Sequence, residues 1–452
     1  MFVKCLRSTM ALVILLALLA ACGQAAAPAP QEEAAAEQPA QEEAAAEEPA
    51  EPGTLRVWVT WGDNPAQMQE LFNKYAEANN VTVQLNAPVD QDKVVAALSG
   101  SQPPDVLVLG GPDDVPGWVN EGLLAPLDEI ITASNIDKDD IFPAMLAQCS
   151  YKDDHYCLPW GTDTYGLYWN KDLFEEAGLD PEQPPQTLEE LTEYADKLTK
   201  FDDNGEITQI GFIPDFSWAH QEQYIPMFGG FWVSEDGTKV QLDSPAVIED
   251  LKWEQQFYTK YGPDKVLKFT SSLGDYNSAE HGFMAGKVAM MVDGEWMTGP
   301  NFIQGLAPEL YYGVAPLPPP ADHPERAGMN MVQGTVAVIP SGVADKAAAG
   351  KLLAWMMSPE IVAEEMVANF NLPSSKKAAE DPRFSENEKF KTFLELSQSP
   401  NTQHMVLNPV HTDILNELGL IYEKVTHAGE DPEPLLKEAQ AKLQSQLDAA
   451  SE

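Results

Sequence analysis

The chain has 452 residues, of which 44% are hydrophobic and 9% aromatic, so it is long enough to bury more than one hydrophobic core. Its formal net charge of -44 opposes binding to nucleic acid and attraction to anionic lipid surfaces. One explanation of the acidic charge is a solvated surface that keeps the protein soluble. The alternative is that the acidic residues select a cationic ligand such as a polyamine.

The first 22 residues are typical of a bacterial lipoprotein signal peptide. Lys4 and Arg7 precede the apolar run 10–21, which is too short to span a bilayer and long enough for the core of a signal. Residues 19–23 read LAACG and resemble a lipoprotein cleavage box with Cys22 as the lipidated first mature residue; an ordinary secretory signal is the alternative. We expect export and a lipid tether at Cys22 to the outer face of the cytoplasmic membrane.

Residues 23–53 are typical of a disordered spacer. They consist mainly of Ala, Glu, Gln and Pro and contain no large hydrophobic side chain, so they cannot bury a core. Their eight glutamates keep the segment extended and solvated. We expect this segment to separate the lipid from the folded part of the chain.

Strands and helices alternate from residue 54 onward. The pattern predicts strands at 54–61, 81–85 and 105–109, with one helix beginning at Pro65 and another spanning 92–98. This alternation predicts an open α/β sheet whose ligands lie beyond the carboxyl ends of its strands. The loops at 61–63 and 110–114 follow two of those strands, so we expect one cleft to receive both loops.

Two cysteines bracket a short polar segment. In an exported protein, Cys149 and Cys157 are expected to form a disulfide, which would add roughly 2–3 kcal/mol of stability for a loop of that size. The alternative, a metal site, needs further ligands, and the seven histidines are scattered singly. We therefore expect no metal.

The stretch 156–199 organises the middle of the chain. It predicts a strand, a loop, a helix capped by Asn170 and ended by Gly178, and a second helix opened by a capping box of Thr187 and Glu190. Two motifs in this stretch resemble the extracellular solute-binding proteins of bacterial sugar ABC importers, the maltose-binding type. They read Y-x-N-K-D-L-F-x-x-A-G-L and P-P-x-T-x-x-E-L-x-x-x-A-x-x-L.

The rest of the chain continues this pattern. The segment 279–296 predicts a helix, a glycine stop, a strand and a loop, and its motif F-x-x-G-K-x-A-M-x-x-x-G-x-W also resembles the family. Elsewhere we predict a polar turn at 202–206, strands at 210–214 and 335–339, helices at 245–261, 344–357 and from 359 to about 369, and a largely helical tail from about 374.

The resemblance implies an α/β protein with the type II fold of periplasmic binding proteins, in which two lobes joined by a hinge enclose a ligand cleft. The hinge is expected near 162–164. The first lobe is expected to comprise 54–162 and about 314–373, and the second 163–313 and about 374–452.

Aromatic and acidic residues at loop starts are the candidates for ligand binding. A sugar ring presents an apolar face that suits a flat aromatic ring, and hydroxyls that suit carboxylate and amide acceptors. Core packing is the alternative for each tryptophan. The candidates are Trp61, Asp63, Gly110, Asp113, Trp160, Asp163, Trp218, Trp232, Asp293, Trp296 and Gln333.

The resemblance assigns roles to some of these candidates. It implies ligand carboxylates at Asp63, Asp113 and Asp163, and a tryptophan that stacks on sugar at Trp296. The chain departs from the maltose-binding pattern at Asp114, which stands where that pattern has an arginine, and it has no tryptophan after Trp355. These departures leave the identity of the sugar open.

The resemblance favours a non-catalytic function. It implies a monomer that closes on a carbohydrate, expected to be an oligosaccharide, and delivers it to membrane permease subunits. There is no GxxxxGK[ST] motif, so the ATPase would be a separate chain, and no cofactor is expected. The rival hypothesis is a secreted glycoside hydrolase with Asp163 and Glu295 as acid and base. The same fold could also bind a polyamine, a peptide or a glycerol phosphate ester; the last is disfavoured because no Arg/Lys cluster lies near the expected cleft.

Overall fold

The computed structural model describes residues 53–451 except 63 and 153. The predicted signal peptide, its Cys22, the spacer up to residue 52, and Asp63 lie outside the described residues. All described residues belong to one compact unit. Within the described part, no helix combines the length and the apolar character needed to cross a membrane.

The first sheet has the strand order β2-β1-β3-β14-β6. The first three strands in sequence are parallel, and β14 runs antiparallel to β3 and β6. The strands are β1 (Thr54–Val59), β2 (Thr82–Asn86), β3 (Val106–Leu109), β6 (Leu158–Pro159) and β14 (Val336–Val338). The strands predicted at 54–61, 81–85, 105–109 and 335–339 are all present with slightly different ends.

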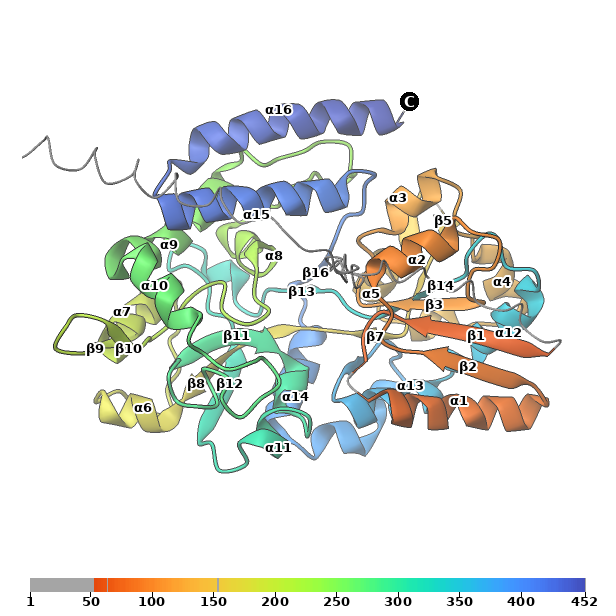
Figure 1. Ribbon diagram of the computed structural model, residues 1–452, viewed down its shortest axis with the longest axis horizontal. Helices are drawn as coiled ribbons and strands as arrows, with labels where there is room; N and C mark the ends of the chain where they lie inside the picture. Colours follow the sequence, from red (N-terminus) through yellow and green to blue (C-terminus); the bar gives the residue numbers. More distant parts are fainter. Residues whose placement is uncertain (1–52, 63, 153, 452) are drawn as a thin grey trace, which may run out of the picture. The chain divides into compact units, whose positions relative to one another are not determined.

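Both faces of the first sheet are buried. Val57 and Val108 pack with α1 (Pro65–Asn79), whereas Trp58 and Leu107 pack in a separate cluster on the opposite face. Figure 1 shows α1 and α13 (Pro359–Asn369) on one side of the sheet, with α2 (Gln91–Leu98) and α3 (Val115–Asn120) on the other. The apolar run of β3 follows from this double covering, because neither of its faces meets water.

The second sheet is antiparallel, with the order β11-β8-β12. Its strands are β8 (Tyr165–Asn170), β11 (Met290–Gly294) and β12 (Tyr312–Pro316). The core beside it takes apolar residues from α7 (Leu188–Leu198) and α9 (Pro245–Tyr261). The two last helices, α15 (His411–Ala428) and α16 (Pro432–Ser451), pack against α9 and lie side by side in Figure 1.

The remaining elements are short or peripheral. They are α4 (Asp128–Ala133), α5 (Pro143–Ala147), β4 (Ser150–Tyr151), β5 (Asp154–His155), β7 (Gly161–Thr162), α6 (Lys171–Glu176), β9 (Lys200–Phe201), β10 (Ile207–Gln209), α8 (Gln221–Tyr224), α10 (Pro263–Thr270), α11 (Ile303–Leu306), β13 (Asn330–Val332), α12 (Lys346–Met356), β15 (Leu372–Pro373), α14 (Glu388–Ser397), β16 (Thr402–His404) and single 3-10 turns.

The helix caps predicted from the sequence are present in the structure. The Asn170 side chain accepts from the Leu173 N–H at 3.1 Å, and the Thr187 hydroxyl accepts from the Glu190 N–H at 3.1 Å. The Glu190 carboxylate accepts from the Gln186 N–H at 2.8 Å, one residue before the cap. Both helices therefore begin where the capping residues predict.

Two predicted elements are absent. Residues 279–285 form consecutive turns rather than a helix, and Gly282 within them lies so close to Leu273 and Val288 that a larger residue would not fit there. The strand predicted at 210–214 is reduced to an isolated bridge at Ile210, and Pro214 has no N–H with which to continue a ladder.

The predicted disulfide between Cys149 and Cys157 is present. Both cysteines are fully buried, and the hairpin of β4 and β5 lies between them. The closed loop is therefore a small structured hairpin.

Three segments connect the elements of the first sheet with those of the second. β7 precedes β8 and pairs with β15, and Asp163 forms a bridge with Gln333, which precedes β14. The Thr162 hydroxyl donates to the Gln333 carbonyl at 2.7 Å. The connection at 161–163 is thus hydrogen-bonded to each of the other two, so the three connections lie together.

Candidate functional site

A cavity of about 450 Å³ lies where residues from both sheets meet, a volume that suits a small organic ligand. Its wall includes seven of the sequence candidates: Trp61, Gly110, Asp113, Asp163, Trp218, Trp296 and Gln333. Trp61 and Gly110 follow β1 and β3, so this side of the cavity lies at the carboxyl ends of parallel strands. Asp113 lies in the same loop as Gly110, while Asp163 and Gln333 belong to the connecting segments. Trp296 follows β11, and Trp218 precedes α8.

Aromatic rings form one part of the wall. Trp218 leaves 51% of its surface exposed, which is unusual for tryptophan. Trp296 is partly buried, and its ring meets Tyr165 edge to face at 5.7 Å between centroids. Tyr165, Tyr276 and Phe302 also line the cavity. The cavity thus presents several flat apolar surfaces together with polar groups.

The connecting segments supply the polar part of the wall. The Asn371 side chain donates to Asp163 Oδ1 at 3.1 Å, and Gln333 lies beside Asp163 through the backbone bridge. Behind them, the fully buried Glu295 accepts from the N–H groups of Thr164 at 3.0 Å and Leu372 at 3.3 Å. Burial, together with the nearby Asp163 charge, raises the pKa of Glu295 well above its usual range.

A third group of polar residues lies at the carboxyl end of β3. His411 Nε2 is 3.3 Å from Asp113 Oδ1, and the Thr412 hydroxyl donates to Asp114 Oδ1 at 3.2 Å. Glu222 also lines the cavity, and burial raises its pKa above the ordinary value. The start of α15 therefore contacts the loop that follows β3.

Three candidates do not line the cavity. Trp160 is fully buried and donates its indole N–H to the Met356 carbonyl at 3.1 Å, so it packs in the core of the first sheet. Trp232 is also buried, in the core beside the second sheet. Asp293 is fully buried behind the wall, where it accepts from the Gly294 N–H at 2.7 Å. In these positions they are packing or supporting residues rather than contacts for a ligand.

Several lining residues were not among the candidates. Tyr276 and Asn277 lie in the loop after α10, and His220 and Asn371 lie just before α8 and β15. Tyr276 carried a usable signal, since it is an aromatic residue in a turn-rich segment. Asn371 carried none, because only the pairing of β15 with β7 brings it to the cavity.

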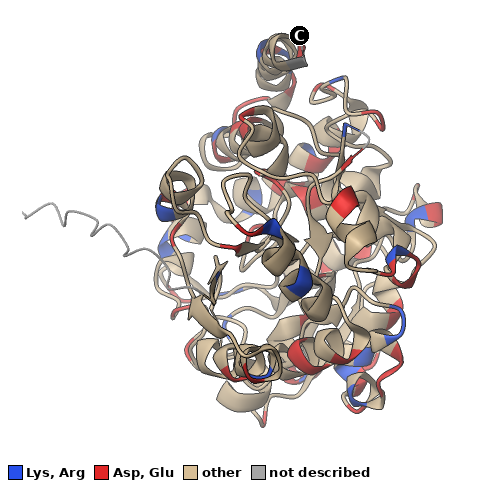
Figure 2. Cartoon of the chain, turned by 90° about the vertical axis from the view of Figure 1, so that its right-hand side faces the viewer, with Lys and Arg blue, Asp and Glu red and all other residues tan. Residues whose placement is uncertain are grey.

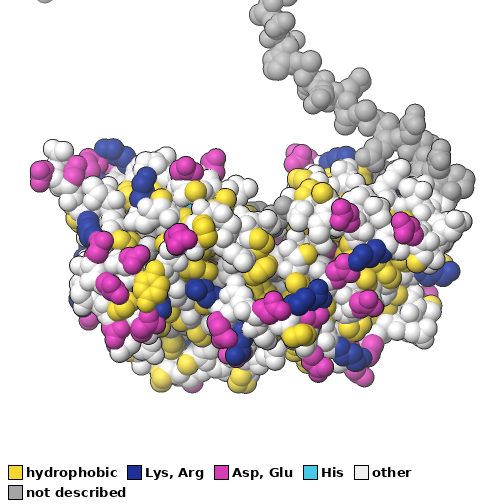
Figure 3. Space-filling model, turned by 90° about the horizontal axis from the view of Figure 1, so that it is seen from below, with side chains coloured by type: hydrophobic (Ala, Val, Ile, Leu, Met, Phe, Trp, Pro, Cys, Tyr) yellow, Lys and Arg dark blue, Asp and Glu magenta, His cyan; other side chains and the backbone are white. Residues whose placement is uncertain are grey.

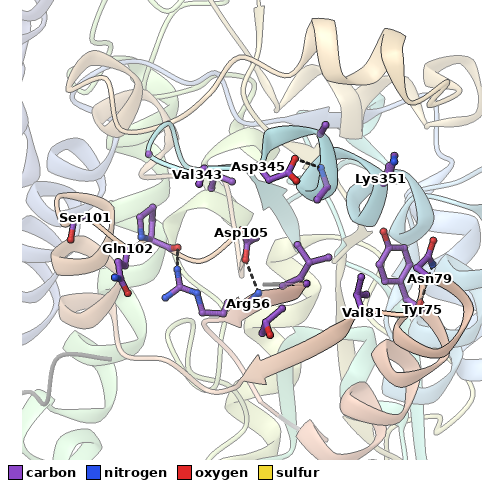
Figure 4. A pocket seen from close by; sticks show the side chains of 18 residues that line it. Arg56, Tyr75, Asn79, Val81, Ser101, Gln102, Asp105, Val343, Asp345 and Lys351 are labelled. Atoms are coloured by element: carbon purple, nitrogen blue, oxygen red, sulfur yellow. Dashed lines mark hydrogen bonds between the residues drawn. The ribbon is translucent and has the colours of Figure 1, made fainter. Parts of the chain in front are cut away.

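A larger cavity, of about 640 Å³, lies at the opposite end of β1 (Figure 4). Its polar groups bond to one another: the Arg56 N–H donates to Asp105 Oδ2 at 2.7 Å and its guanidinium to the Pro103 carbonyl at 2.6 Å. Asp345 caps α12 through the Ala348 N–H at 2.9 Å. This larger cavity lies at the amino ends of the strands, and Tyr75 is the one aromatic residue among the described residues that line it. We therefore do not regard the larger cavity as the main ligand site.

Charges distinguish the smaller cavity from the outer surface. Figures 2 and 3 show basic and acidic residues interspersed on the faces drawn. The described residues that line the cavity include Asp113, Asp163 and Glu222 but no lysine or arginine. Carboxylates accept hydrogen bonds from hydroxyls, whereas a phosphate is usually bound by cationic donors. In the described part of the chain, no three His, Cys, Asp or Glu side chains are grouped so that they could hold a metal ion.

Residues 60–363 match the bacterial extracellular solute-binding protein family. The chain is 26% identical over 339 residues to the maltotriose-binding protein of Pyrococcus abyssi, which covers 73% of this chain and 68% of that protein. It is 24% identical over 272 residues to the sn-glycerol-3-phosphate-binding periplasmic protein UgpB of Brucella abortus, covering 57% of this chain and 59% of UgpB.

Solved structures show the same similarity in three dimensions. CpMnBP1 with mannobiose bound has a TM-score of 0.77 and 28% identity, covering 86% of this chain and 99% of that one. The fold is that of the maltose-binding-like periplasmic binding proteins, which confirms the fold predicted from the sequence. Because the family match extends over more than half of the sequence, this chain belongs to the bacterial extracellular solute-binding proteins.

Proposed function

We propose that this chain is the substrate-binding component of an ABC importer and that it captures an oligosaccharide in the cavity between the two sheets. The observation that carries the proposal is the composition of that cavity, in which tryptophan and tyrosine rings face carboxylate and amide groups and no lysine or arginine is found among the described lining residues. The similarity to proteins named or solved as binders of maltotriose and mannobiose supports the same ligand class.

Within this proposal, the lining residues divide into two roles. Trp61, Trp218 and Trp296 stack on the apolar faces of sugar rings, while Asp113 and Asp163 accept hydrogen bonds from hydroxyls, assisted by the amides of Gln333 and Asn371. Gly110 leaves space beside the ligand. Asp63 keeps the role of a further acceptor that the family resemblance implies.

We further propose that the two sheets belong to two lobes, of 54–162 with about 314–373 and of 163–313 with about 374–452. A ligand that contacts both lobes favours the closed arrangement through its greater affinity for that arrangement. The closed monomer would dock on permease subunits whose ATPase is a separate chain. The lipid tether at Cys22, after a signal peptide and before a spacer, would keep the protein beside its permease.

The contacts of Glu295 do not favour the glycoside hydrolase hypothesis. A general acid must reach the glycosidic oxygen. Glu295 is fully buried, and each of its carboxylate oxygens accepts a backbone N–H, from Thr164 and from Leu372. A carboxylate held in this way supports the connecting segments and does not face the cavity.

The proposal is tested by thermal shift and calorimetric titration of the purified domain with maltotriose, mannotriose, glycerol 3-phosphate and spermidine. A trisaccharide at 100 times its Kd should stabilise the protein by about 2.7 kcal/mol. Trp296→Ala should lower trisaccharide affinity at least tenfold. The matched control is Trp355→Ala, because Trp355 packs on Tyr75 of α1 and does not line the cavity. Binding of spermidine or glycerol 3-phosphate without binding of any saccharide would contradict the proposal.

A further inference from the structure

Trp296 is held in place by a chain of hydrogen bonds that leads from the cavity wall to a carboxylate behind it. Its indole N–H donates to the Tyr276 hydroxyl at 2.6 Å, and that hydroxyl donates to Asp293 Oδ1 at 3.1 Å. The Tyr276 hydroxyl therefore accepts one hydrogen bond and donates another, and both are directed by its neighbours. The orientation of the Trp296 ring depends on the carboxylate two bonds away.

The same carboxylate also reaches the segment that carries Trp218. Asp293 Oδ2 accepts from the Ser217 hydroxyl, and Ser217 has a positive φ of 73°, an uncommon conformation for a residue other than glycine. Ser217 immediately precedes Trp218, whose ring stands at the cavity with half of its surface exposed. A bond to Asp293 thus fixes the backbone turn that directs Trp218.

Tyr276 also contacts both Trp296, through its hydroxyl, and Trp218, through its ring. Its ring meets the Trp218 ring edge to face at 5.9 Å between centroids and the Phe302 ring at 5.2 Å. Asp293 itself does not line the cavity and is fully buried at the end of β11. One buried carboxylate is consequently linked by hydrogen bonds to two of the three tryptophans that line the cavity, to Trp296 through Tyr276 and to the Trp218 segment through Ser217.

Burial of a carboxylate in this position costs free energy, because the group loses its hydration. No described Lys, Arg or His lies within ion-pair distance of Asp293, and burial raises its pKa to about 7 in spite of the hydrogen bonds from Ser217, Gly294 and Tyr276. An apolar residue of similar volume would often serve packing alone equally well. The position of the carboxylate between the two aromatic segments offers a use for it.

We propose that Asp293 is a positioning residue of the saccharide site, which sets the orientation of Trp296 through Tyr276 and of Trp218 through Ser217 without touching the ligand. The inference rests on the proposed function for its ligand class. It differs from the role suggested by the sequence, in which Asp293 is a ligand contact.

Two variants test the proposal by calorimetric titration with maltotriose and mannotriose. Tyr276→Phe removes only the hydroxyl, and Asp293→Leu removes all acceptors while keeping the number of side-chain heavy atoms. Each should weaken trisaccharide binding at least fivefold. The matched control is Tyr261→Phe, which also deletes a tyrosine hydroxyl that donates to a carboxylate at 3.1 Å, that of Asp196, but away from the cavity; it should leave affinity unchanged.

A double-mutant cycle separates positioning from a general loss of stability. If Tyr276 acts through Trp296, then Tyr276→Phe should change affinity less than twofold in a Trp296→Ala background. An equal loss of affinity with and without Trp296, or no loss in either single variant, would overturn the proposal.

A readout without ligand makes the inference independent of the proposed function. In nitrogen-15-labelled protein, the Trp296 indole N–H should exchange with solvent at least tenfold faster in Tyr276→Phe and Asp293→Leu than in the wild type. If the wild type binds neither trisaccharide, the proposed function fails and the exchange rates still decide the positioning. Unchanged exchange in both variants would overturn the inference even if saccharide binding is observed.

Discussion

Glu365 on α13 is a carboxylate that the fold buries completely. It accepts from the Asn369 amide at 2.8 Å and from the Gln67 amide at 3.3 Å, and burial raises its pKa from 4.5 to about 7. Between pH 4.5 and about pH 7 the folded protein therefore binds a proton that the unfolded chain has released. Its contribution to stability is fully present below pH 4.5 and is lost as the pH rises through 7.

We expect Glu365→Gln to flatten the pH dependence of stability. The linkage relation gives about 3 kcal/mol for the loss in the wild type across this window, and an amide at this position cannot ionise. Urea denaturation at pH 5 and pH 8 measures the difference. The matched control is Glu364→Gln on the exposed neighbouring position, which forms a surface ion pair with Lys74. Equal pH slopes in the Glu365→Gln variant and the wild type would contradict the prediction.

For single residues, the sequence identifies candidate types such as tryptophans beside turns, but it does not predict which of them are buried. Trp160 and Trp218 both stand beside turns, yet one lies in the core and the other lines the cavity. The difference arises from α12, whose Met356 carbonyl receives the Trp160 indole N–H. Such a partner is far away in sequence, so the local pattern contains no trace of it. The carboxylate–tyrosine–tryptophan chain was missed for the same reason.

Helix α7 shows how far a local signal determines an element. Its apolar positions Leu188, Leu191, Ala195 and Leu198 are all buried, as their spacing predicts. Its start depends on the Thr187 hydroxyl, which satisfies one of the helix N–H groups that lack a partner within the helix.

Thr187→Ala should therefore lower the free energy of unfolding by about 1 kcal/mol, the usual cost of losing an N-cap. Thermal or urea unfolding measures this value. Thr392→Ala is a suitable control, because this exposed hydroxyl lies inside α14 and only donates to the Glu388 carbonyl; alanine is a good helix former there. A loss as large in the control as at Thr187 would refute the capping argument.

Elements were predicted well where local pattern and tertiary packing agree. The helix predicted at 245–261 has those bounds in the structure. The helix predicted at 279–285 does not form; the segment folds as turns in which Gly282 packs closely on Leu273 and Val288, contacts that its periodicity does not reveal. Contacts of this kind override helical propensity in short segments.

For the whole molecule, the three hydrogen-bonded connections are the natural place for a hinge. They share the bonds of β7 with β15 and of Asp163 with Gln333, and Glu295 holds two of them. When one connection bends, the other two must therefore bend with it. This coupling favours a single concerted motion over independent movement of the two proposed lobes.

We expect saccharide to reduce the radius of gyration measured by small-angle X-ray scattering, because the ligand favours the arrangement in which both walls contact it. Trp296→Ala at the same saccharide concentration should retain the radius of the free protein. An unchanged radius in wild-type protein that is shown by calorimetry to be saturated would argue against closure on binding.

The position of β14 has a consequence for biosynthesis. This strand lies between β3 and β6 in the first sheet, although its residues follow all three strands of the second sheet along the chain. In a growing polypeptide, the edge of β3 that faces away from β1 therefore has no partner strand until synthesis has passed Val338. The first sheet is therefore completed only after the whole of the second sheet has been synthesised.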